Sequence, residues 1–196
     1  MSKLKIFSRT EAISLIAILA VLVAVALPNF AASLRRARDQ VRRDDLGALM
    51  TALNLYQMDF SVYPPSAGDG KIVDCLKPGD EPYKDKRGIW VLNPVSCVWG
   101  QDAFINLFTK KEYMAILPRD PDWQKGVNYL YISDGQRYQL FASMEGKDEA
   151  EVDPAITAEG LHCGTRICNV GRSVNCDIPK TLEQCAAEDA AKLLQK

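Results

Sequence analysis

The stretch that decides the fold runs from Ala12 to Leu34 and reads AISLIAILAVLVAVALPNFAASL. Its first part, as far as Leu27, has no charged residue, and its one polar side chain is Ser14. A helix rises about 1.5 Å per residue, so the stretch would be about 35 Å long. The apolar core of a bilayer is about 30 Å thick, and a helix satisfies its own backbone hydrogen bonds there. The sequence therefore predicts one membrane-spanning helix near the start of the chain.

A secretory signal peptide and a buried core helix are the alternatives for this stretch. The small residues within 27–33 could form a cleavage site. Glu11 and Pro28 argue against a signal peptide. An acidic side chain costs roughly 2.5–3.5 kcal/mol at the centre of a membrane helix and less near its end, so Glu11 needs a partner or a shallow position. Pro28 lacks a backbone donor, which predicts a kink or local melting of the helix.

The rest of the sequence has the composition of a small globular domain. The chain has 196 residues, of which 47% are hydrophobic and 25% charged, and its formal net charge is −1. That length allows one domain of ordinary size with an appendage. A net charge close to zero provides no general attraction to nucleic acid, so no specific nucleic-acid partner is expected.

The cysteines predict disulfide bonds in an oxidising compartment. The sequence contains six of them: Cys75, Cys97, Cys163, Cys168, Cys176 and Cys185. We favour a Cys75–Cys97 pair, with the four C-terminal cysteines pairing among themselves. A zinc site built from these four and His162 is the alternative, but the paired Cys-x-x-Cys spacing of such sites is missing.

The N-terminal residues resemble the signature of type IV pilins and of type II secretion pseudopilins. Phe7 is followed four residues later by Glu11, which is followed seventeen residues later by Pro28, and Lys3 and Lys5 precede them as a basic leader. Residues 35–64 also resemble the end and exit of the long pilin helix. Residues 113–121 resemble the segment before the pseudopilin sheet.

This resemblance implies a processed subunit of a helical filament. A prepilin peptidase would cleave between Ile6 and Phe7, and the new amino terminus would be a site of methylation. Glu11 of one subunit would then pair with the amine of Phe7 on its neighbour, which offsets the cost of either charge in an apolar interior. Pro28 would allow local extension as subunits leave the bilayer. One departure from the family is Ile6, which stands where the leader usually ends in glycine.

The implied partners are other copies of the chain or other pilins, the prepilin peptidase, an inner-membrane assembly platform and the lipid bilayer. The expected location is the cytoplasmic (inner) membrane, crossed once, with the C-terminal domain outside the cytoplasm and a surface or periplasmic filament after assembly. Arginines at positions 35–43 follow the span, and the positive-inside rule alone would place that domain in the cytoplasm. The cysteines favour the oxidising side. We interpret the arginines as a solvated or headgroup-facing band.

The predicted fold is α+β, with a long N-terminal transmembrane-plus-amphipathic helix packed on a small antiparallel sheet. The expected parts are a leader at 1–6, an assembly helix at 7–34, a pilin-like domain at 35–154 and a cysteine-rich C-terminal region at 155–196. A helix ending near Gln57 would bury an apolar stripe on the sheet. That stripe comprises Leu46, Leu49, Met50, Leu53 and Tyr56.

The later segments each have a predicted structure. Residues 66–100 are rich in glycine and proline and read as a loop region. A second helix is expected at 101–117. An Asp-Gly turn between 127–132 and 137–144 predicts a β-hairpin. A terminal helix is expected at 181–194.

An acidic segment follows the predicted hairpin. In the major pseudopilins of type II secretion, the loop after the equivalent strand binds calcium, and clustered oxygen ligands suit that ion. The resemblance therefore suggests calcium as a possible cofactor, the alternative being an ordinary solvated loop. The candidate ligands are Glu145, Asp148, Glu149 and Asp153.

Enzymatic activity is not expected. His162 is the sole histidine, and the phosphate-binding, nucleophile-elbow and zinc-protease motifs are missing from the sequence. We expect a filament subunit. The alternative is a monomeric membrane-anchored domain that binds a ligand or adheres to a surface.

Overall fold

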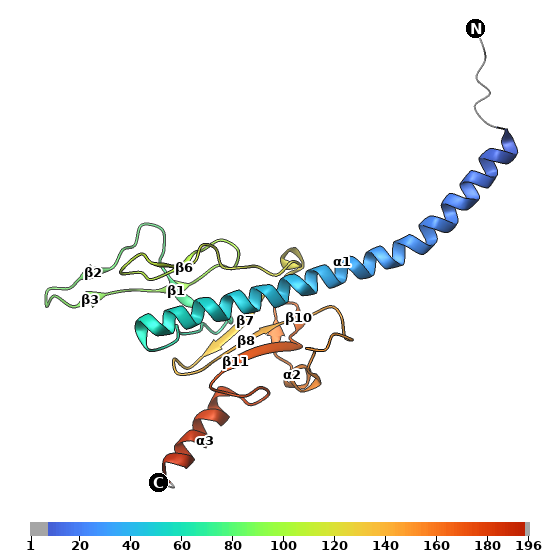
Figure 1. The fold of residues 1–196 in the computed structure, drawn as a ribbon. Helices are drawn as coiled ribbons and strands as arrows, with labels where there is room; N and C mark the ends of the chain where they lie inside the picture. Colours follow the sequence, from blue (N-terminus) through green and yellow to red (C-terminus); the bar gives the residue numbers. More distant parts are fainter. Residues whose placement is uncertain (1–7, 195–196) are drawn as a thin grey trace.

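A single long helix organises the computed structural model, which describes residues 8–194 (Figure 1). This helix, α1 (Arg9–Phe60), has 52 residues and is about 78 Å long at 1.5 Å per residue. Its N-terminal half extends away from the rest of the protein, and its C-terminal half lies across the folded domain. The predicted long helix is therefore confirmed.

Helix α1 ends three residues later than the sequence predicts. Ser61 adopts a left-handed conformation with φ of 61°, and its backbone N–H donates to the carbonyl of Gln57 at 2.7 Å. Such a left-handed residue commonly closes the last helical turn. Pro64 and Pro65 follow soon afterwards and cannot continue the helix.

The predicted apolar stripe of α1 is confirmed. Leu46, Leu49, Leu53 and Tyr56 are buried, and Met50 packs against the same core while partly exposed. The core also contains Leu140, Tyr131 and Tyr138 of the central sheet and Tyr129, which precedes β7. The C-terminal half of α1 is thus attached to the domain by ordinary apolar packing.

The central sheet has three antiparallel strands, β7 (Leu130–Ser133), β8 (Tyr138–Ala142) and β11 (Val170–Val174), in the order β11-β8-β7. The hairpin of β7 and β8 is the one that the sequence predicts. Asp134 closes it by accepting from the backbone N–H groups of Gln136 at 2.9 Å and Arg137 at 2.7 Å, and Gly135 has φ of 87°. The predicted α+β class is confirmed.

Strand β11 comes from the cysteine-rich C-terminal region but pairs along its whole length with β8. This region therefore contributes to the central sheet. The domain boundary at residue 155 stays a prediction.

The remaining elements are short. Four two-stranded ladders are formed by β1 (Val73–Cys75) with β4 (Val95–Ser96), β2 (Tyr83–Lys84) with β3 (Trp90–Val91), β5 (Phe104–Ile105) with β6 (Glu112–Met114), and β9 (His162–Cys163) with β10 (Arg166–Ile167). The helices are η1 (Trp123–Lys125), α2 (Pro154–Glu159) and α3 (Leu182–Leu194), of which α3 confirms the predicted terminal helix. Strands β1 to β4 fall within 66–100, so the prediction of a loop region there was incomplete.

The helix predicted at 101–117 was wrong, because this segment forms the β5–β6 hairpin. Asn106 turns the chain: its side-chain oxygen accepts from the backbone N–H groups of Phe108 and Thr109, both at 3.0 Å. Lys110 completes the turn in a left-handed conformation with φ of 61°. Asparagine competes with helix formation in this way because its side chain offers the backbone a local partner.

All six cysteines form disulfides. Cys75 pairs with Cys97, as the sequence predicts, and connects β1 to the residue after β4. The four C-terminal cysteines pair among themselves, Cys163 with Cys168 and Cys176 with Cys185. Because these thiols are oxidised, they are not available for the alternative zinc site, and His162 is exposed.

Candidate assembly interface

The N-terminal half of α1 is an apolar helix without a covering layer in the monomer. Its large side chains are exposed on every face; Ile16, Leu19 and Leu22, for example, are 67%, 62% and 61% exposed. This helix is long and apolar enough to cross a membrane. A helix that is hydrophobic all round needs a lipid or protein environment, because water does not solvate it well.

Small residues form one line along this helix. Ala17, Ala20 and Ala24 follow the i, i+3, i+7 spacing that places side chains on one face. Small side chains let helices approach closely in apolar surroundings. The line therefore provides a surface for helix–helix contact.

The predicted local melting at Pro28 was wrong, and a kink at this residue stays a prediction. Pro28 lies inside the continuous helix, whose N-terminal half bends without a break (Figure 1). Proline removes one backbone donor, and the turns on both sides retain their own hydrogen bonds. Asn29, the next residue, donates from its side chain to the carbonyl of Val25 at 3.4 Å.

Glu11 has a local role at the start of α1. Its carboxylate accepts from the backbone N–H of Ser8 at 2.8 Å, and its own backbone N–H donates to the Ser8 hydroxyl at 3.3 Å. This reciprocal pair is a capping box, which satisfies two backbone donors that a helix start leaves free. Ile6 and Phe7, the predicted processing residues, lie outside the described residues. The predicted contact between Glu11 and a neighbouring amine stays a prediction.

A buried arginine marks the point where α1 enters the domain. Arg42 is fully buried and donates through Nε and Nη2 to both oxygens of Asp120, at 2.7 and 2.9 Å. It also donates to Asp39 at 2.7 Å and to Asp122 and Glu145, both at 3.2 Å. The interpretation of the arginines as a solvated or headgroup-facing band was therefore wrong for Arg42, because four carboxylates surround it, three of them from distant parts of the chain.

The electrostatics of this cluster favour ionised carboxylates. Burial alone would raise the pKa of Asp122, but Lys125, Arg166 and Arg42 together lower that pKa to about 2. Arg38 and Arg42 likewise lower the pKa of Glu145, with the Arg38 hydrogen bonds making the largest contribution. Asp122 and Glu145 are therefore ionised at neutral pH and are counter-ions of Arg42.

Three further arginines of α1 bind the acidic segment after β8. Arg38 donates to both oxygens of Glu145 at 2.6 and 2.8 Å. Arg43 binds Glu149 at 2.7 Å and also contacts Glu151. Arg35 reaches Asp148 at 3.2 Å.

The four candidate calcium ligands already have partners within the protein. Glu145, Asp148 and Glu149 pair with arginines, while Asp153 caps α2 by accepting from the backbone N–H of Ala155 at 2.8 Å. Within residues 8–194, no group of three or more acidic, cysteine or histidine side chains is placed to hold a metal. The donor set does not fit a calcium shell of six to eight oxygens.

The sequence did not point to Asp120 and Asp122 as partners of the arginines. Both precede η1, about 80 residues from Arg42, and ion pairs at such separations leave no local pattern. The sequence signal for this network was the cluster of arginines just after the apolar stretch. Arginines at that place are also typical of a band next to the membrane surface, which is how we interpreted them.

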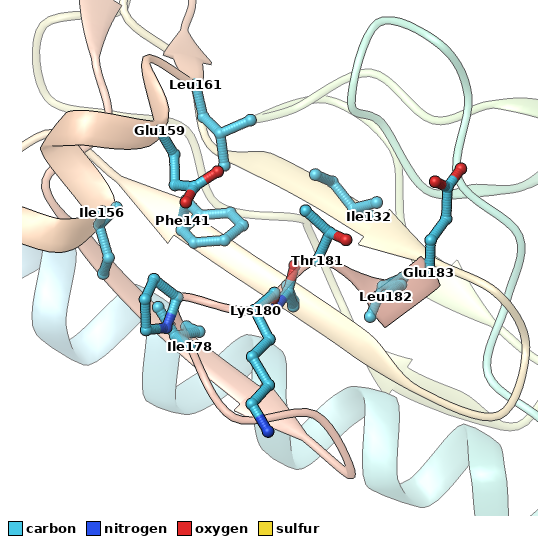
Figure 2. Close-up of a pocket in the computed structure, with 12 residues that line it drawn as sticks. Ile132, Phe141, Ile156, Glu159, Leu161, Ile178, Lys180, Thr181, Leu182 and Glu183 are labelled. Atoms are coloured by element: carbon cyan, nitrogen blue, oxygen red, sulfur yellow. Dashed lines mark hydrogen bonds between the residues drawn. The ribbon is translucent and has the colours of Figure 1, made fainter. Parts of the chain in front are cut away.

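A second feature is an apolar cavity of about 310 Å³ on the face of the sheet opposite α1 (Figure 2). Phe141, Ile132 and Ile156 approach it from the sheet and α2, and Ile178 and Leu182 from the C-terminal segment. Lys180 extends away from it, and its ammonium pairs with Glu188 at 2.7 Å. The ionisable lining residues are two glutamates and this lysine, which do not make a catalytic group of the kinds considered above.

The fold and the exposed helix have the arrangement that the sequence resemblance implies: an apolar helix long enough for a membrane, continuous with a helix that packs on a small antiparallel sheet. The comparison with known proteins agrees. The chain is 28% identical over 145 residues to the type II secretion system core protein G of Vibrio cholerae, and the match covers 74% of this chain and 82% of that protein. No family model and no solved structure matches the chain. The resemblance to type IV pilins and type II secretion pseudopilins is confirmed.

Proposed function

We propose that the chain is a structural subunit of a pseudopilus or pilus filament and that it assembles through the exposed half of α1. The observation that carries this proposal is the 12–34 stretch, whose large apolar side chains are exposed on all faces in the monomer. The relation to a core protein of type II secretion supports it. Bilayer lipid would cover the helix before assembly, and the helices of neighbouring subunits would cover it afterwards.

The assembly step follows from the physical chemistry of Glu11. In the monomer this carboxylate caps its own helix through Ser8. In a filament, the amine of a processed Phe7 on the neighbouring subunit would be a stronger partner, because an ion pair gains more in apolar surroundings than in water. The axial register of the filament would thus depend on one charge pair. Processing between Ile6 and Phe7 by a prepilin peptidase is part of this proposal.

A location in the cytoplasmic membrane before assembly, with α1 as the anchor, is part of this proposal. The three disulfides favour the oxidising side for the domain. Contacts with an inner-membrane assembly platform and with other pilin-like subunits complete the proposed set of partners. A structural role without enzymatic activity is part of this proposal, and the relation to a core protein of type II secretion supports it.

Replacing Glu11 by glutamine tests the charge pair, because glutamine can preserve the capping box while removing the charge. We expect Glu11→Gln to be made and inserted normally but to be lost from sheared filaments scored by immunoblot and electron microscopy. Ser8→Ala is the matched control, since it removes half of the cap and keeps the charge, and it should still assemble. Normal assembly of Glu11→Gln would exclude the charge-pair mechanism.

The alternative is a monomeric membrane-anchored domain, which the isoleucine before Phe7 favours. Mass spectrometry of the native N-terminus, with and without the prepilin peptidase, separates the two functions. A mature chain that begins at Phe7 supports the filament subunit. An unprocessed Met1 in both samples supports the monomeric tether.

A further inference from the structure

The acidic segment after β8 lies directly against the arginines of α1. Its carboxylates at Glu145, Asp148 and Glu149 each bind a different guanidinium group of that helix. Glu145 is the best held, because it receives two bonds from Arg38 and a third from Arg42. The segment is thus neutralised by side chains that belong to the same folded unit.

The backbone of the segment is fixed to the same helix. The two oxygens of Asp39 accept from the backbone N–H groups of Glu145 and Gly146, both at 2.9 Å. Gly146 allows this close approach, since a Cβ atom there would lie 2.8 Å from Cγ of Glu149 and 3.3 Å from Asp39. Arg42 in turn neutralises Asp39. Side chains and backbone of the segment therefore dock on one surface of α1.

A calcium ion in this place would need these same oxygens. Calcium is bound by six to eight oxygen atoms at 2.3–2.6 Å. The oxygens of Glu145 and Glu149 already lie 2.6–2.8 Å from guanidinium nitrogens. A divalent ion would have to displace Arg38 and Arg43, which would then be partly buried without a counter-charge.

From these contacts we infer that the guanidinium groups of Arg38 and Arg43 serve as the permanent counter-ions of the 145–151 segment, so that the domain folds and stays folded without calcium. Ion pairs within the chain hold the segment in its folded conformation, and a bound metal ion is not needed. This inference concerns the domain alone and holds whether the protein assembles or remains a monomer.

The test compares the thermal unfolding of the full-length protein in detergent with excess calcium chloride and with excess EGTA. The wild-type midpoint should be the same in both. Arg43→Gln leaves Glu149 and Glu151 without their shared cation, and its midpoint in EGTA should fall by about 2–4 °C. Calcium should then raise the midpoint of this variant, because freed carboxylates become available to the ion.

Arg137→Gln is the matched control. Arg137 pairs with Asp134 and Asp189 at the other end of the sheet, so this variant should lose stability without gaining a response to calcium. The inference is overturned if the wild-type midpoint falls in EGTA and recovers with calcium. It is also overturned if Arg43→Gln in EGTA is as stable as the wild type, since Arg43 would then not hold the segment. Isothermal titration of calcium chloride into the wild type should give no binding heat.

Discussion

Arg42 and Asp120 form a buried two-pronged ion pair that fastens α1 to the segment before β7, with Nε to Oδ2 at 2.7 Å and Nη2 to Oδ1 at 2.9 Å. The two residues are 78 positions apart in the sequence. Planar, two-bond geometry of this kind orients its partners as well as attracting them. The pair thus fixes the point at which the exposed half of α1 leaves the domain.

Replacing Arg42 by leucine should lower the free energy of unfolding by about 3–5 kcal/mol, because it leaves buried carboxylates without a cation. Arg42→Lys should fall between this variant and the wild type, since lysine keeps the charge but cannot form the two-pronged pair. Denaturant unfolding of the full chain in detergent, followed by tryptophan fluorescence, measures both. Arg36→Leu is the control at an exposed arginine and should change little. An Arg42→Leu protein as stable as the control would exclude a structural role for the pair.

Asp74 should make the free energy of unfolding fall as the pH rises, whereas a carboxylate in an ion pair makes it rise. It is buried, one of its oxygens has no partner among the described residues, and burial raises its pKa from 3.8 to about 7 against a small opposing effect of Tyr56. The native state then holds a proton that the unfolded chain has released. Stability from this residue is greatest below about pH 4, falls as the pH rises to about 7, and is constant above that.

Asp74→Asn removes this dependence. The variant should exceed the wild type in unfolding free energy at pH 8 by an amount on the order of 2–4 kcal/mol, and the difference should vanish near pH 4. Denaturant titrations at several pH values check this. A difference that is the same at pH 4 and pH 8 would show that the pKa of Asp74 is not raised in the native state.

The features that could be predicted from the sequence are those with a local pattern. The apolar stripe of α1 repeats with the helical period, and Asp134-Gly135 marks the β7–β8 turn by its own chemistry. The helix predicted at 101–117 failed on a local competitor: the side chain of Asn106 bonds two backbone groups and turns the chain. The sequence pattern alone does not reveal whether the helix or the asparagine-stabilised turn has the lower free energy.

The arginine network could not be predicted, because each of its pairs with the acidic segment joins residues more than 100 positions apart. At the level of sequence, arginines at 35–43 after an apolar helix suit a membrane surface equally well. Only folding brings Asp120 and Glu145 to the same guanidinium group. For the same reason, acidic residues that resemble a metal-binding loop in sequence have arginines as their partners in the structure.

The three disulfides should contribute unequally to stability. In the chain-entropy description, the contribution grows with the length of the loop that a disulfide closes. Cys75–Cys97 spans 22 residues and Cys163–Cys168 spans 5, which corresponds to about 3 and about 2 kcal/mol. The double variants Cys75→Ala/Cys97→Ala and Cys163→Ala/Cys168→Ala, compared by denaturant unfolding, should follow that order. The reverse order would mean that native-state packing around β9 and β10 outweighs loop entropy.

The two halves of α1 should respond differently to the same substitution. Leu53 is fully buried in the domain core, and Leu53→Ala should lower the free energy of unfolding by about 2–5 kcal/mol through lost packing and a new cavity. Leu19 is 62% exposed in the monomer, so Leu19→Ala should change the unfolding of the domain by less than about 0.5 kcal/mol. If the exposed half of α1 is the assembly surface, Leu19→Ala should instead reduce recovery of the protein in sheared filaments. Loss of domain stability in Leu19→Ala would show that residues 9–34 pack on the domain, and the exposed helix would then not be free to assemble.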